Sequence, residues 1–169
     1  MTKVIIALVV LVLLAVAIKV FEEFTRSRKP QFQYRRKDSV MTEAERECFH
    51  ALVSEMGKDY YFFPQMHLDA IVQPTDTRKD RFYAFRHINQ KSLDFVACDK
   101  TRLCPLFAIE VDDKTHNQAK RVERDAEVER ILRGAGIPLI RIQNRGRFDA
   151  KELAAEVQKG MDDFYAKPI

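Results

Sequence analysis

The sequence predicts an α/β fold in which an N-terminal transmembrane helix precedes an α/β sandwich built around a small mixed sheet. Three observations predict it. The chain of 169 residues starts with an uninterrupted apolar run at residues 4–18. Helical and strand-like patterns then follow in the order helix, strand, connection, two strands, helix, strand, helix. The strand–helix–strand passage from residue 104 to residue 142 has the length of a parallel crossover.

The apolar run VIIALVVLVLLAVAI is extended by Val20 and Phe21 beyond Lys19. Residues 4–21 reach the lower limit for a membrane span, about 17 residues, if Lys19 snorkels toward the headgroups. The alternative is a signal peptide, because Ala15-Val16-Ala17 resembles a cleavage site.

Seven basic residues begin at the end of this run, and such a cluster resists translocation. They are Lys19, Arg26, Arg28, Lys29, Arg35, Arg36 and Lys37. We therefore expect an uncleaved, single-pass anchor in the inner (plasma) membrane, with the domain on the cytoplasmic side. We assign residues 1–21 to the anchor, 22–40 to a basic linker that touches anionic lipid, and 41–169 to the α/β domain.

Charge is unevenly distributed along the chain. Residues 1–40 hold eight Lys and Arg against three Asp and Glu, whereas the rest of the chain is nearly balanced. The sequence pI of about 9.0 therefore reflects the N-terminal segment, and net charge alone does not indicate a nucleic-acid-binding face. The three cysteines lack metal-ligand spacing, and their odd number fits no closed disulfide framework. Free thiols in a reducing compartment, two of them buried, are the better interpretation.

The domain begins with a predicted helix. Thr42-x-x-Glu45 has the form of a capping box, an apolar stripe follows at helical spacing, and Gly57 is a natural stop. Residues 60–68 read as a strand in which Pro64 implies an edge position or a bulge. A polar, basic connection follows at residues 73–91, and its RFYAFRHI segment is expected to form a short helix. We expect the aromatic residues at 60–63 and 82–85 to belong to the core.

Two short apolar strands come next, at residues 93–98 and 104–111, joined by a polar turn. The helical pattern of residues 117–134 ends at glycines. Residues 137–142 form a further apolar strand. A last amphipathic helix, capped by Asp149, covers residues 150–165.

The two central strands carry acids where a strand is usually apolar. Glu110 and Asp112 share one face of their strand, while Ile109 and Val111 take the other. If the strands pair as a hairpin, Asp94 comes beside Glu110. Carboxylates gathered there repel one another unless a cation or a proton neutralises them. Oxygen ligands of this kind suit Mg²⁺ or Mn²⁺.

An ordered series of segments resembles the PD-(D/E)XK, or restriction-endonuclease-like, nuclease superfamily, whose core is helix, three strands, helix, strand. The resemblance covers about residues 41–145. More narrowly, the chain resembles an uncharacterised bacterial domain family within it, and its layout is similar to that of very-short-patch repair endonucleases. The segments are Thr42-x-x-Glu45, Leu93–Val96, Ile109–Asp113 with His116, Arg124-Asp125 and Ala135–Arg141.

The resemblance implies a Mg²⁺-dependent (or Mn²⁺-dependent) nuclease acting on DNA or RNA. Asp94 and Glu110 match the two metal-binding acids of the motif, and the carbonyl of Val111 would complete their set. Asp112 occupies the position where the motif has a lysine, and it would assist catalysis or bind a second ion. This departure favours an alternative, a non-catalytic module that binds nucleic acid or a protein partner at the membrane. A third hypothesis is a structural partner in a larger membrane complex.

Accessory roles at the site are open for Glu45, Asp113, Lys114, His116, Asp125 and Gln143. Each has a structural alternative. Glu45 can act purely as a helix cap, and the segment from Asp113 to His116 is also an ordinary turn and helix start. Asp125 can form a solvated pair with its neighbour Arg124. Gln143 ends the last strand near the acids and is a candidate contact to substrate.

Overall fold

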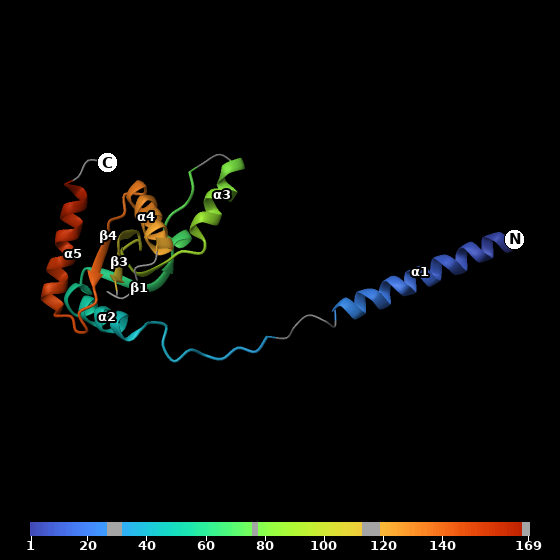
Figure 1. The fold of residues 1–169 in the computed structure, drawn as a ribbon, viewed down its shortest axis with the longest axis horizontal. Coiled ribbons are helices and arrows are strands. Elements are labelled where there is room, and N and C mark those ends of the chain that lie inside the picture. The colour runs from blue at the N-terminus through green and yellow to red at the C-terminus, as the bar shows by residue number, and fades with distance from the viewer. Residues whose placement is uncertain (27–31, 76–77, 113–118, 167–169) are drawn as a thin grey trace. The chain divides into compact units, whose positions relative to one another are not determined.

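The structure is a computed structural model of the whole chain, and it describes residues 1–26, 32–75, 78–112 and 119–166 (Figure 1). The chain divides into two compact units, Met1–Lys37 and Asp38–Ile169. Each unit is described by itself below.

The first unit contains one long helix, α1 (Thr2–Arg26), whose described side chains are all exposed. Its segment Thr2–Phe24 has 23 residues, contains an 18-residue window with a mean hydropathy of 3.2, and is long and apolar enough to cross a membrane. A signal sequence near an N-terminus meets the same requirement. The expected apolar helix is therefore present, and it continues beyond the predicted boundary at residue 21.

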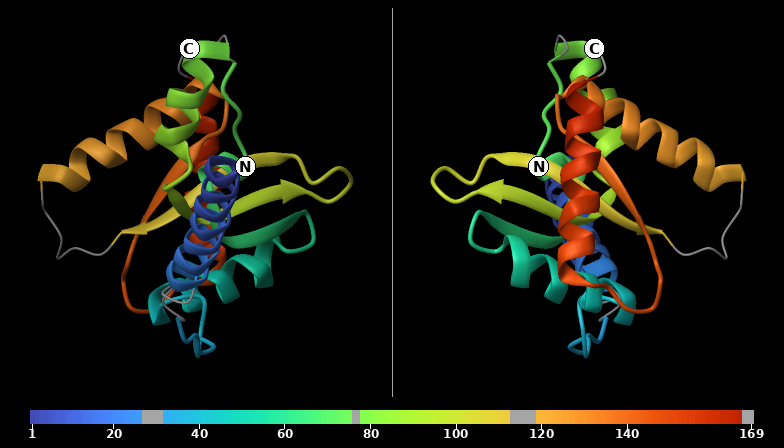
Figure 2. Two further views of the ribbon diagram at one scale, coloured as in Figure 1. Left: turned by 90° about the vertical axis from the view of Figure 1, so that its right-hand side faces the viewer. Right: turned by 90° about the vertical axis from the view of Figure 1, so that its left-hand side faces the viewer.

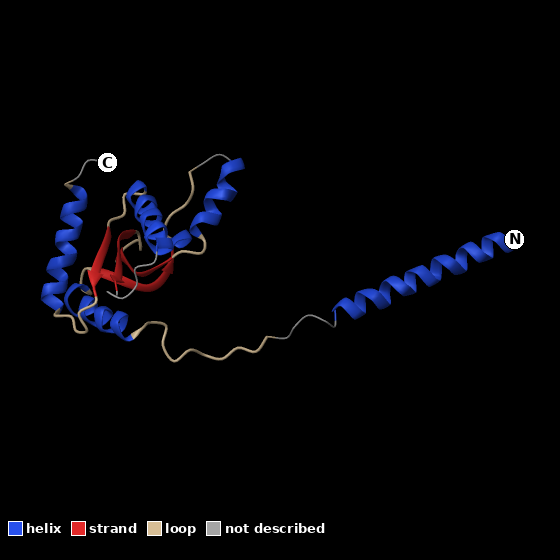
Figure 3. Ribbon diagram, viewed as in Figure 1, coloured by secondary structure: helices blue, strands red, loops and turns tan. Residues whose placement is uncertain are grey.

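The second unit is an α/β domain with a four-stranded sheet in the order β1-β2-β3-β4 (Figure 3). Strands β1, β2 and β3 pair antiparallel, and β4 pairs parallel to β3 after the crossover through α4. The predicted mixed sheet and its parallel crossover are thus confirmed. The elements are α2 (Glu43–Met56), β1 (Tyr60–His67), the 3-10 helix η1 (Leu68–Ala70), α3 (Arg78–Ile88), β2 (Ser92–Asp99), β3 (Pro105–Asp112), α4 (Ala119–Gly134), β4 (Leu139–Gln143) and α5 (Ala150–Tyr165).

Helices cover both faces of the sheet (Figure 2). Helices α2 and α5 pack on one face, where Phe95, Phe107 and Leu52 are almost fully buried. The other face packs against α4, η1 and the end of α3, around Val96 and Leu132. Because alternate residues of Phe95–Cys98 and of Phe107–Ile109 enter the two clusters, the middle of both central strands is buried on both faces, as their apolar runs predict.

Local signals in the sequence set several boundaries. The capping box at the start of α2 is present: Glu45 N–H donates to the Thr42 hydroxyl, and the Glu45 carboxylate accepts from Thr42 N–H. Asp149 caps α5 by accepting from two backbone N–H groups. Strand β1 lies at a sheet edge, where Pro64 is tolerated, and the next residue, Gln65, has a φ of 52° and interrupts the pairing with β2 without changing its register.

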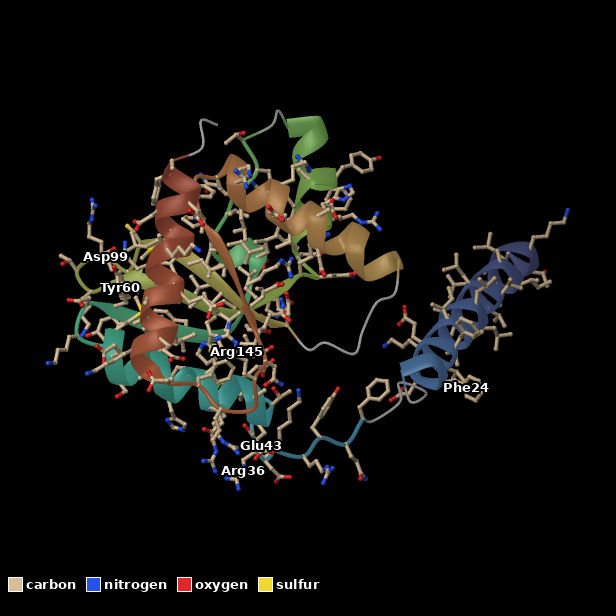
Figure 4. The ribbon with its side chains drawn as sticks, turned by 60° about the vertical axis from the view of Figure 1, so that its left-hand side comes forward. Phe24, Arg36, Glu43, Tyr60, Asp99 and Arg145 are labelled. Carbon is tan, nitrogen blue, oxygen red and sulfur yellow. The ribbon has the colours of Figure 1, made fainter. Side chains whose placement is uncertain are left out.

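The β2–β3 hairpin closes through a side chain. The Asp99 carboxylate accepts hydrogen bonds from three backbone N–H groups of the turn, those of Thr101, Arg102 and Cys104. Asp99 also pairs in register with Tyr60 of the edge strand, and the two lie side by side in Figure 4.

The expectation that all the aromatic residues at 60–63 and 82–85 are core is wrong in part. Phe62 is buried, but Tyr61 is 48% exposed. On α3, Phe82 is 63% exposed and Phe85 is 43% exposed. A stripe at helical spacing shows which residues share a face, but it does not show what covers that face.

Candidate functional site

Asp94 lies where β2 and β3 separate. The paired register of the two strands ends at Phe95 and Ile109. Asp94 is the residue before Phe95 on β2, and its Oδ2 accepts a hydrogen bond from the backbone N–H of Val111, at 2.8 Å. The side chain thus takes the place of a main-chain acceptor and holds the carboxylate between the two strands.

Glu110 and Asp112 project from the same face of β3, as their spacing predicts, and both contact Arg141 of β4. Arg141 pairs with Glu110 in the parallel register. Its Nη1 lies 3.1 Å from Oε2 of Glu110 and 3.2 Å from Oδ1 of Asp112. The three side chains are only partly exposed: 17% for Glu110, 34% for Asp112 and 29% for Arg141. One guanidinium therefore bridges two carboxylates.

Sequence reasoning did not place Arg141 in the site, although a signal was available. Arg141 is the charged residue of the apolar segment IPLIRI, so a partner for it was to be expected. Its partner depends on which strand lies next to β4, and only the sheet order decides that.

Glu45 and Asp125 bring further negative charge from the flanking helices. Glu45 of α2 caps its own helix, with its Oε2 2.7 Å from Thr42 N, and its charge also acts on Asp94. Asp125 of α4 acts on both Glu110 and Arg141. Capping and proximity to the site are therefore compatible for Glu45. We call Glu45, Asp94, Glu110, Asp112 and Asp125, with Arg141, the acidic cluster.

Burial, and to a smaller degree the neighbouring negative charges, shifts the ionisation of the two innermost acids. Burial raises the pKa of Glu110 to about 7; Arg141 opposes this shift, and Asp94, Asp125 and Asp112 add to it. Burial also raises the pKa of Asp94 to about 6, opposed by the hydrogen bond from Val111 and assisted by the charges of Glu45 and Asp112. The cluster therefore holds protons at a pH where isolated carboxylates have lost them.

The guanidinium responds to the same charges. Burial lowers the pKa of Arg141, but Glu110 and Asp112 more than offset that effect, and the pKa is raised above its ordinary value. Arg141 therefore stays charged and acts as a permanent counter-cation for the carboxylates.

A sequence comparison assigns the domain. The family described as "Protein of unknown function (DUF2726)" matches residues 37–160. The chain belongs to this family. The match includes the whole acidic cluster and the sheet that carries it. No curated protein and no solved structure matches the chain.

The remaining candidate residues contribute less to the geometry. Gln143 is exposed and pairs in register with Asp112 at the end of β4. The candidates Asp113, Lys114 and His116 lie outside the described residues. Among the residues that the structure describes, no three His, Cys, Asp or Glu side chains are placed to hold a metal ion.

Proposed function

We propose that this DUF2726 domain is a divalent-cation-dependent nuclease that cleaves DNA or RNA phosphodiesters. The observation that carries the proposal is the meeting of four carboxylates, those of Glu45, Asp94, Glu110 and Asp112, from a helix and two strands. They bring more negative charge than the guanidinium of Arg141 neutralises, and an excess of this kind attracts a cation.

The order of the elements also supports the proposal. Apart from η1 and α3, which lie between β1 and β2, the domain runs α2, β1, β2, β3, α4, β4 before its last helix, and this is the helix, three strands, helix, strand order of the restriction-endonuclease-like core that the sequence resembles. Asp94 and Glu110 lie on the second and third strands, at the point where those strands separate.

Mg²⁺ or Mn²⁺ fits the chemistry of the donors, because all of them are carboxylate oxygens. The arrangement fits only after a change, since Arg141 holds Glu110 and Asp112 and must release them before both can bind an ion. Asp94 and Glu110 would then hold the ion, with Asp112 assisting. When bound, the ion would supply Lewis acidity at phosphorus and lower the pKa of a water molecule.

The protein's own groups also bear on this chemistry. The pKa of Glu110 is about 7 without an ion, so Glu110 would have to release its proton to bind one, and ion binding would strengthen as the pH rises. The guanidinium of Arg141 matches the geometry of a phosphate group, and once released from the carboxylates it can bind one. Asp94 is held in position by Val111 N–H.

A non-catalytic module is the second candidate, and the Arg141 bridge favours it. In this alternative Arg141 permanently supplies the cation that the carboxylates need, and Asp112, in place of the motif's lysine, provides part of its binding site. The domain would then bind nucleic acid or a protein partner without cleaving it.

We also propose that α1 remains uncleaved and holds the domain at the cytoplasmic side of the inner membrane. The basic residues that follow the apolar segment support this orientation. Protease added to right-side-out vesicles should leave the domain intact, and protease added to inverted vesicles should digest it. The reverse pattern, or release of a soluble domain, would overturn this topology.

The test of the nuclease proposal is calorimetry of residues 38–169 with Mg²⁺ and Mn²⁺, combined with cleavage assays on labelled DNA and RNA. This piece contains every residue of both core clusters, so it can fold without α1. The variants are Asp94→Asn, Glu110→Gln and Arg141→Gln. Glu47→Ala is the matched control, because Glu47 is an exposed acid of α2, the helix that also carries Glu45.

The nuclease proposal requires metal binding and cleavage that Asp94→Asn and Glu110→Gln abolish and Glu47→Ala retains. Folded wild-type protein that binds no ion and cleaves nothing would overturn it. If only Arg141→Gln binds an ion, the arginine is the resident cation, and the non-catalytic module is the better description.

A further inference from the structure

We propose that α3 is a membrane-surface helix, whose exposed aromatic and basic side chains dock the domain on anionic lipid. This inference does not depend on the nuclease proposal. It uses the chemistry of α3 (Arg78–Ile88), which the acidic cluster does not involve.

The exposed side of α3 is both aromatic and basic. Phe82, Tyr83 and Phe85 are 63%, 65% and 43% exposed. At 100° per residue, they fall within about 160° of the helix circumference. Arg86 belongs to this side, because its guanidinium carbon lies 6.0 Å from the centre of the Phe82 ring. This combination is typical of helices that lie in a membrane interface.

The charge of the segment favours an anionic partner. Its sequence RKDRFYAFRHI contains four Lys and Arg and one Asp. The described acid on α4 that contacts this region, Glu127, is already paired with Lys91 at 2.8 Å and with His87 at 3.2 Å. Glu127 therefore adds little negative charge to the surface of α3. A second copy of α3 would bring like charges together, which disfavours a homodimer through this face.

An open apolar groove continues the surface. It has a volume of about 470 Å³ and runs between Phe82 and Phe85 of α3 and Val72 and Pro74, which follow η1; one acid, Asp69 of η1, also lines it. Among the α3 side chains that the structure describes, Ile88 is the buried one, and it also lines this groove. An interface of rings, aliphatic groups and cations suits the boundary between lipid headgroups and acyl chains.

The chain itself brings a membrane within reach. Residues 27–42 connect α1 to α2, and such a segment spans at most about 55 Å when fully extended. If α1 crosses a bilayer, the domain stays close to its surface. Even weak affinity of α3 for lipid then produces docking, because tethering makes the second contact intramolecular.

The protein contains no tryptophan, so one substitution creates a specific reporter. We would reconstitute full-length Phe82→Trp into vesicles of phosphatidylcholine with or without phosphatidylglycerol, using lipids brominated on their acyl chains as quenchers. Tyr61→Trp is the matched control. Tyr61 is an exposed aromatic residue on β1, and its ring also has a cation nearby, with Lys100 Nζ 5.0 Å from the ring centre.

We expect the tryptophan emission of Phe82→Trp to shift to shorter wavelength and to be quenched in anionic vesicles, and high salt to reverse both effects. The emission of Tyr61→Trp should change little. The same two variants of residues 38–169, added to preformed vesicles, give a result that does not depend on insertion of α1. In that preparation, adding Arg86→Gln to Phe82→Trp should reduce partitioning about fivefold.

Quenching of Phe82→Trp beyond that of Tyr61→Trp in either preparation supports the proposal. If Phe82→Trp is quenched no more than Tyr61→Trp in both, α3 does not dock on lipid. An emission shift of Phe82→Trp that grows with protein concentration in the absence of vesicles would show that a second copy covers α3, and would overturn the proposal.

Discussion

Nη1 of Arg141 on β4 lies 3.1 Å from Oε2 of Glu110 on β3, and the two residues are directly paired in the parallel register. The same nitrogen lies 3.2 Å from Oδ1 of Asp112, two residues further along β3. Because Glu110 and Asp112 face the same way, a single side chain on the neighbouring strand can reach both. The acidic strand end therefore contains its own cation, and the properties of the site depend on that cation.

Removal of the guanidinium should destabilise the domain. Arg141→Gln leaves Glu110 and Asp112 side by side without a counter-charge, and we expect a loss of about 1–3 kcal/mol, between the values typical of surface and buried pairs. Urea unfolding of residues 38–169 measures this. Arg145→Gln is the control, because Arg145 pairs with Glu156 in a more exposed position, and we expect it to cost less than about 1 kcal/mol. Equal losses in the two variants would contradict a special role for Arg141.

Stability should fall as the pH rises from 5 to 8. The pKa values of Asp94 and Glu110 are raised in the folded state, to about 6 and about 7, so the folded protein binds more protons than the unfolded chain in this range. Their contribution is present at low pH and is lost as the pH passes through the folded-state values. We expect a decrease of about 2–4 kcal/mol in the free energy of unfolding.

Urea titrations at several pH values measure the decrease, and Glu110→Gln should flatten the curve. Asp99 and Glu127 have lowered pKa values, so their contributions are lost only as the pH falls below this range, and they do not interfere. Addition of Mg²⁺ at pH 8 should restore stability to wild type if the cluster binds the ion. Stability that rises from pH 5 to 8 would contradict the pKa shifts.

Two substitutions of Asp94 should separate its structural role from its charge. Asp94→Asn keeps an oxygen that can accept from Val111 N–H, so we expect stability close to that of the wild type. Asp94→Ala leaves this N–H without its acceptor, at a cost of about 1–3 kcal/mol. Both variants should lose any binding of a divalent cation. Chemical unfolding and calorimetry on the same samples provide the comparison, and equal stability of the two variants would refute the structural role.

The three cysteines should differ in reactivity. All are free thiols; Cys48 and Cys98 are buried and Cys104 is exposed. Burial, together with the charges of Asp94 and Glu156, raises the pKa of Cys48 to about 12, and burial also raises that of Cys98. A thiol reagent should therefore react rapidly with one group in the native domain and with all three after denaturation. Cys104→Ser should abolish the rapid phase; rapid labelling that persists in this variant would show that a buried thiol becomes accessible.

Local patterns determined most of the elements. Helix caps and strand edges depend on interactions within a few residues, so the sequence predicts them directly. Examples are the capping box of Thr42 and Glu45, the N-cap Asp149 and the edge-strand proline Pro64. The alternation of Ile109, Glu110 and Val111 is equally local, and it placed the acids on one face of β3. The apolar length of α1 likewise follows from composition alone.

Tertiary structure decided what those residues meet. The order of the strands placed Arg141 next to Glu110. Because β2 and β3 separate at this point, the Asp94 carboxylate can accept a hydrogen bond from Val111 N–H. Packing left the aromatic side of α3 exposed, where the sequence had predicted core. A side-chain pattern reports the period of one element, whereas pairing and burial depend on neighbours that are distant in the chain. The sequence by itself therefore determined the elements and the carboxylates, and only the fold decided their counter-charge and their exposure.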